Sequence, residues 1–139
     1  MLVGILGALA VGGVTGLRTF AALAVLLYAR RDWLSIVAGV ALLGELIGDL
    51  LPTAPARTRM LGLLARGIFG GFCAAIVGAR SGLPYWAGAV CGVVAAIAFA
   101  YAGVGWRLRI APSLKLNAVI AALLEDVAAV GAAIAVIGL

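Results

Sequence analysis

The chain has 139 residues, of which 66% are hydrophobic and 11% charged, and its formal net charge is +5. Soluble domains average about 45–50% apolar and about 25% charged residues, so this composition predicts an integral membrane protein without a sizeable aqueous domain. The chain has no histidine and only two isolated cysteines, which excludes a zinc-type cluster, a haem attachment motif and a histidine-based catalytic triad. We therefore expect a protein that is not an enzyme and carries no cofactor.

Five apolar runs follow one another along the chain, separated by charged residues and helix breakers. They cover about 2–28, 33–51, 60–79, 85–105 and 116–138. A transmembrane helix needs about 20 apolar residues, so we expect an all-α protein with a single domain over 1–139, a bundle of about five transmembrane helices. The connections are short, which predicts that neighbouring helices are antiparallel. Trp33, Tyr85, Trp86 and Trp106 lie at run ends, where aromatic rings anchor helices at the headgroup level.

The basic residues of the connections predict how the bundle is inserted. They fall on two sides of the predicted bundle, with Arg57, Arg59, Arg107, Arg109 and Lys115 on one side and Arg30, Arg31 and Arg80 on the other. The positive-inside rule favours a cytoplasmic N-terminus and an outside C-terminus, but a bias of five to three leaves the opposite orientation open. Because most basic residues flank apolar runs, we expect no nucleic-acid partner.

The first run contains both an internal arginine and a cluster of glycines. Arg18 lies near the middle of this run, two positions after the stretch Gly12–Gly16, where the helix could be irregular or broken. Glycine pairs at four-residue spacing recur in the later runs, at Gly44/Gly48, Gly67/Gly71, Gly78/Gly82 and Gly88/Gly92. Such spacing lets helix backbones approach closely in lipid. We expect tight helix packing and a homo-oligomer, most simply a dimer.

Four of the five acids lie inside apolar runs, Glu45 and Asp49 in the second and Glu125 and Asp126 in the fifth. An ionised acid near a helix centre costs on the order of 2.5–3.5 kcal/mol on insertion scales, so these four must be paired, protonated or in contact with water. Glu45 and Asp49 share one helix face because they are four residues apart. The internal counter-charges are Arg18 and Arg66, the latter about two turns into the third run.

Two inner arginines cannot pair with four inner acids unless flanking arginines reach inward, and the flanking candidates are Arg57, Arg107 and Arg109. The sequence therefore predicts that at least one of the four acids is protonated or cation-bound near neutral pH. Cation or proton binding would then be coupled to the activity of the protein.

The sequence also contains a faint internal repeat. The stretch from Gly12 to Arg18 is echoed by Ala102 to Arg107, and each is followed one run later by a leucine-rich segment with an acid, Glu45 and Glu125 respectively. If the first two and the last two runs are copies, the third run makes them inverted in the membrane, an arrangement found in many secondary transporters. Chance similarity in such a biased composition is an equally good explanation.

Several short motifs together resemble the small bacterial membrane proteins grouped as domain-of-unknown-function family 4126. The motifs are Gly16-Leu17-Arg18-Thr19-Phe20, Gly44-Glu45-Leu46-Ile47-Gly48-Asp49-Leu50-Leu51-Pro52, the Thr53–Arg59 stretch before Leu61-Gly62-Leu63-Leu64-Ala65-Arg66, and Leu123-Leu124-Glu125-Asp126. A lysine often follows the aspartate of the second helix in that family, and Leu50 stands there in this chain. The resemblance implies a multi-pass protein of the bacterial inner membrane whose charged positions form one set, and it implies no particular activity.

Two functions fit these observations best, and a membrane-embedded lipid enzyme comes third because no matching motif is present. Intramembrane ionisable residues mark ion or substrate paths, which favours a small transporter or channel-like protein that moves a small ion or solute. Its substrate- or ion-binding site would comprise the six inner charged residues, Arg18, Glu45, Asp49, Arg66, Glu125 and Asp126. The alternative is a non-transporting membrane assembly or lipid-binding scaffold in which the same charges form structural ion pairs.

Overall fold

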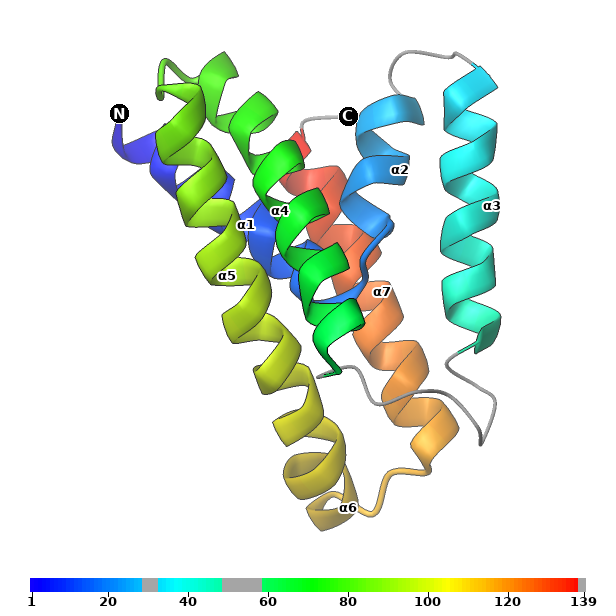
Figure 1. Cartoon of the computed structure of the whole chain (residues 1–139). Helices are drawn as coiled ribbons and strands as arrows, with labels where there is room; N and C mark the ends of the chain where they lie inside the picture. The colour runs from blue at the N-terminus through cyan, green and yellow to red at the C-terminus, as the bar shows by residue number, and fades with distance from the viewer. Residues whose placement is uncertain (29–32, 49–58, 138–139) are drawn as a thin grey trace.

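The computed structural model describes residues 1–28, 33–48 and 59–137, and these are helical with no β-strand among them. The helices are α1 (Leu2–Leu17), α2 (Ala21–Tyr28), α3 (Trp33–Gly48), α4 (Met60–Arg80), α5 (Tyr85–Gly105), the π-helix η1 (Trp106–Ile110), α6 (Ala111–Ser113) and α7 (Ala118–Ile137) (Figure 1). Three stretches, Met60–Arg80, Tyr85–Ser113 and Val119–Ile137, are long and apolar enough to cross a membrane. The prediction of an all-α protein with transmembrane helices is thereby confirmed, whereas α1 and α3 are shorter apolar helices.

The first apolar run does not form the single helix that we predicted over 2–28. Helix α1 ends at Leu17, Arg18 is extended with φ −137° and ψ 112°, and α2 begins at Ala21. The glycines of Gly12–Gly16 are helical, so the break follows them. The prediction fails because hydropathy measures only apolar content, and this run remains apolar through the break.

The two arms of this run lie against the same end of the bundle. A Cβ built on Gly4 would lie 3.1 Å from the Cβ of Leu83, in the α4–α5 turn, and Leu27 of α2 lines a small cavity together with Arg80. In Figure 1, α1 runs from the N-terminus to the middle of the bundle and α2 returns toward the starting end. We call α1 and α2 the re-entrant hairpin, because both of its arms lie against the same end of the bundle. Its N-terminus lies at the same end as the last described turn of α7, so the prediction that the two termini lie at opposite ends is wrong (Figure 1).

The direction of α1 relative to α5 contradicts the predicted inverted repeat. Close contacts between α1 and α5 join Gly12 to Gly92 and Gly16 to Ala96, so the residue numbers rise together along both helices. The two helices are parallel, whereas copies related by inversion would be antiparallel. The repeat motifs of the first and fourth runs consequently do not mark an inverted pair of helices.

Helices α1, α4 and α5 form the tightly packed centre of the bundle. A Cβ on Gly12 would lie 2.5 Å from the carbonyl oxygen of Gly92, and a Cβ on Gly92 would lie 2.4 Å from the carbonyl oxygen of Gly70. These close approaches confirm the expected glycine packing for α1, α4 and α5. Gly44 has no such neighbour within 4 Å, and α3 packs on α2 at the edge of the bundle (Figure 1).

Candidate functional site

The tip of the re-entrant hairpin, residues 18–20, places non-helical backbone inside the bundle. Arg18 is 1% exposed and Thr19 is 6% exposed. The backbone N–H of Arg18 still donates to the carbonyl oxygen of Val14 (2.8 Å), which completes the last turn of α1. The next N–H groups lie at the start of α2, where a helix has no internal acceptors for them. In a membrane interior these donors require protein partners.

A single carboxylate, that of Glu45 in α3, accepts hydrogen bonds from two of these N–H groups. Its Oε1 accepts a hydrogen bond from the backbone N–H of Thr19 (2.8 Å), and its Oε2 accepts one from the N–H of Phe20 (3.1 Å). A negative charge at this place is favoured by the positive end of the α2 dipole. Glu45 therefore caps the second arm of the hairpin and joins α3 to the hairpin tip.

Arg66 of α4 also approaches the Glu45 carboxylate. Its Nη2 is 3.7 Å from Oε1 of Glu45, and its Nη1 donates to the carbonyl oxygen of Gly62 (3.3 Å). Arg66 is buried, so this arginine does not extend to the headgroup region, as the sequence alone had allowed. The guanidinium brings a counter-charge from α4 to the hairpin tip.

Arg18 joins the hairpin tip to α7. Its guanidinium donates from Nε to Oδ1 of Asp126, and its Nη2 also lies against the same oxygen. The side chains of Arg18 and Asp126 are 1% and 16% exposed. Removing two charges from water is costly unless they are paired, so this contact offsets the cost of burying an arginine at the tip.

A third pair involves Arg107, which we did not include in the predicted site. Its Nε donates to Oε2 of Glu125 at 2.8 Å, and the Glu125 side chain is 3% exposed. Arg107 belongs to the π-helix η1, and π-bulges often occur at functional sites. The sequence placed Arg107 at a helix end as a topology determinant. In the faint internal repeat Arg107 corresponds to Arg18, and this correspondence indicates that its side chain could point into the bundle.

The structure thus brings five of the six predicted site residues together around the hairpin tip, namely Arg18, Glu45, Arg66, Glu125 and Asp126. Asp49 lies outside the described residues, as does Arg57. Because Arg107 reaches inward, three acids face three arginines within the described ranges. The excess of inner acids over inner arginines is therefore smaller than the sequence suggested. That at least one of the four acids is protonated or cation-bound stays a prediction.

No protein-family model matches the chain, and comparisons with the curated proteins and with the solved structures give no match. The resemblance to domain-of-unknown-function family 4126 therefore stays a prediction from the quoted motifs. Among the described residues, no group of three or more cysteine, aspartate or glutamate side chains is arranged to hold a metal ion. The chemistry of the site is consequently argued from its own charges and hydrogen bonds.

Proposed function

We propose that the protein is a small membrane transporter or channel-like protein of the bacterial inner membrane, with its polar site at the tip of the α1–α2 hairpin. One observation carries the proposal: residues 18–20 are non-helical, Arg18 and Thr19 are buried there, and charged side chains of α3, α4 and α7 face this tip. Non-helical backbone at membrane depth is tolerated where protein buries it or where it lines a cavity. Transporters build their binding sites from such discontinuous helices.

In this proposal α3, α4, α5 and α7 cross the bilayer and α1–α2 enters and leaves it on one side. The protein would work as a homo-oligomer, most simply a dimer, because so few helices make a thin wall around a path. The outer face of α3 supports this part of the proposal. Gly44 is exposed on this face and a Cβ there would meet nothing within 4 Å, so a second backbone could approach closely.

Glu45 is the residue through which we propose coupling to a proton or cation. As a carboxylate it accepts from two backbone N–H groups and faces Arg66. A proton on one oxygen removes the negative charge and weakens that oxygen as an acceptor. The cap on α2 then loosens, α3 is freed from the tip, and an ion or polar solute gains access to Arg18 and Arg66.

The test is flux into liposomes, with protons followed by an internal pH dye and K⁺ by a potassium-sensitive dye. We expect the wild-type protein to pass at least one of them faster than empty vesicles do, and Glu45→Gln to lose most of that flux. The control is Arg109→Gln, which removes an exposed arginine and should retain it. Wild-type-like flux in both Glu45→Gln and Glu125→Gln would remove these acids from the mechanism.

The alternative function is a non-transporting membrane assembly or lipid-binding scaffold. The observation that favours it is that each inner acid in the described ranges faces an arginine, as structural ion pairs do. For a scaffold we expect no flux in the wild type, and charge-neutralising variants should lower thermal stability and oligomer yield together.

A further inference from the structure

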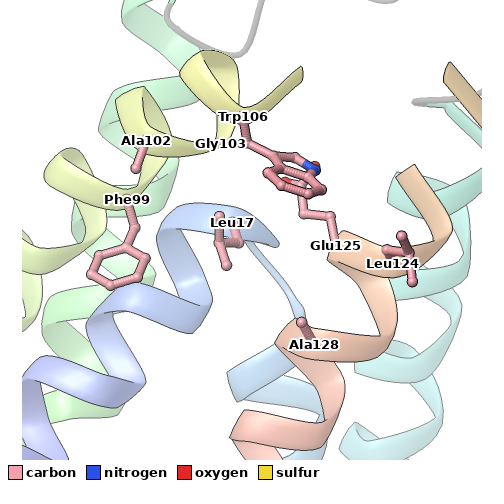
Figure 2. Close-up of a pocket in the computed structure, with 8 residues that line it drawn as sticks. All are labelled: Leu17, Phe99, Ala102, Gly103, Trp106, Leu124, Glu125 and Ala128. Carbon is pink, nitrogen blue, oxygen red and sulfur yellow. The ribbon is translucent and has the colours of Figure 1, made fainter. Parts of the chain in front are cut away.

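A cavity of about 510 Å³ lies beside the hairpin, between the second half of α5 and the first half of α7. It is lined by Leu17, Phe99, Ala102, Gly103, Trp106, Leu124, Glu125 and Ala128 (Figure 2). Phe99 and Leu124 are 46% and 49% exposed, so the cavity opens on the outside of the bundle. The volume falls within the range of about 300–1,000 Å³ that is typical of small-molecule sites.

The lining is apolar except at one end. Glu125 is the only charged residue that lines the cavity, and its carboxylate accepts a hydrogen bond from Arg107 just outside the lining. In Figure 2 the side chains of Trp106 and Glu125 extend from η1 and α7 into the space between these elements. The Arg107 side chain is 26% exposed, and a guanidinium has five N–H donors, so it can bind a second acceptor while it bonds Glu125.

The surroundings of the cavity indicate which acceptor would reach Arg107. Helices α5 and α7 belong to stretches long enough to cross a membrane, so the open side of the cavity would face lipid chains. Arg109 and Lys115, on either side of α6 in the sequence, are exposed. They add positive charge close in the sequence to Arg107, at the polar side of the cavity, which favours an anionic group.

We propose that this cavity binds an anionic phospholipid of the bilayer. One acyl chain lies against Leu17, Phe99 and Leu124, and the phosphate accepts hydrogen bonds from Arg107. This site goes beyond the proposed transport function, because it needs neither movement of the hairpin nor the Glu45 cap. It also assigns η1 a role: the π-helix brings an arginine to the mouth of an apolar cavity.

Trp106 is a built-in reporter for this site. The other tryptophans, Trp33 and Trp86, are 71% and 73% exposed at the ends of their helices, so Trp33→Phe and Trp86→Phe leave a protein with one tryptophan in the cavity. The protein is reconstituted in phosphatidylcholine with increasing fractions of either brominated phosphatidylglycerol or brominated phosphatidylcholine. We expect Trp106 fluorescence to report about a fivefold higher apparent affinity for the anionic lipid, the factor that one basic residue near an anionic headgroup provides.

Two substitutions locate the binding. Ala102→Phe places a ring in the cavity and should abolish the preference, whereas Ala98→Phe, at an exposed position of α5 outside the lining, should keep it. Arg107→Gln should reduce the preference to about onefold, and Arg107→Lys should retain part of it because lysine still attracts a phosphate. Ala102→Phe leaves all three ion pairs in place, so its result stands even if Arg107→Gln does not fold.

Equal quenching of Trp106 by the two brominated lipids in the otherwise unchanged chain would overturn the proposal. A preference that survives Ala102→Phe would also overturn it, because the lipid would then be elsewhere. Inorganic phosphate separates a lipid from a free anion: phosphate binding by the protein in detergent, with no extra quenching by brominated phosphatidylglycerol, would contradict a lipid ligand. The flux of the Glu45→Gln variant tests the transport proposal separately, because Glu45 does not line this cavity.

Discussion

At the scale of single residues, the feature with the largest expected effect on the free energy of unfolding is an arginine that is buried at a helix break. Arg18 is 1% exposed and its guanidinium faces Asp126. Glu45 completes the arrangement from the other side by accepting from the N–H groups of Thr19 and Phe20. A buried ion pair adds little net stability, but removal of one partner leaves an uncompensated charge.

We therefore expect Asp126→Asn to lower the free energy of unfolding by about 3–5 kcal/mol. The double change Arg18→Met with Asp126→Leu should recover much of the loss, because it removes both charges. Arg109→Gln, at an exposed position, should stay within about 0.5 kcal/mol of the wild type. Thermal unfolding of the purified protein in detergent measures all three, and a double variant no more stable than Asp126→Asn would show that the charges are not coupled.

At the scale of elements, backbone contact between glycines holds α1, α4 and α5 together. A Cβ on Gly92 would meet the Cβ of Ala74 and the carbonyl oxygen of Gly70, each at 2.4 Å. Neither obstacle is the flexible end of a side chain, so α4 and α5 would have to separate. The same substitution at Gly131 meets nothing within 4 Å.

Gly92→Ala should consequently destabilise the protein by about 1–3 kcal/mol, the usual cost of overpacking. Gly131→Ala provides the matched control inside a helix and should raise stability by about 0.5–1 kcal/mol, because alanine loses less backbone entropy than glycine on folding. Both variants are heated to a series of temperatures, and size-exclusion chromatography then measures how much protein remains folded at each. Equal effects of both changes would contradict the close approach of α4 and α5.

At the scale of the whole molecule, the re-entrant hairpin changes the predicted topology. Five crossings would put residue 2 on the same side as Lys115, whereas the hairpin puts it on the side of Ser81 (Figure 1). Arg59, Arg109 and Lys115 precede α4 or flank α6, away from that side, so the positive-inside rule predicts a cytoplasmic location for them and an N-terminus outside.

Labelling of engineered cysteines tests this arrangement. In a chain with Cys73→Ala and Cys91→Ala, single cysteines at Leu2, Ser81 and Lys115 occupy exposed positions. A membrane-impermeant maleimide applied to intact cells should label the first two alike and leave Lys115→Cys unlabelled until the membrane is opened. If Leu2→Cys and Lys115→Cys are instead accessible from the same side of the membrane, the five-crossing topology is correct and the hairpin topology is wrong.

The sequence predicted most of the charged residues of the candidate site, but it did not predict where the first helix ends and the chain turns back. The high cost of an unpaired acid in an apolar run was enough to single out Glu45, Glu125 and Asp126. The break after Leu17 could not be seen in hydropathy, because the residues on either side are equally apolar. Its stability depends on Glu45, a carboxylate 25 residues away in the sequence from the Phe20 N–H that it accepts. The sequence named Arg107 as one of three flanking arginines that could reach inward, but it could not single out Arg107, since a helix-end arginine is usually a topology determinant.

The pairing of Arg18 with Asp126 has a consequence for how the chain enters the membrane during synthesis. The two residues are 108 positions apart, so the hairpin leaves the ribosome long before its partner on α7 has been made. Synthesis proceeds from the N-terminus at about 5–20 residues per second, which leaves the arginine without Asp126 for several seconds. The hairpin tip can therefore reach its buried position only after the last helix has been inserted. The first segment to be synthesised is the last to be completed.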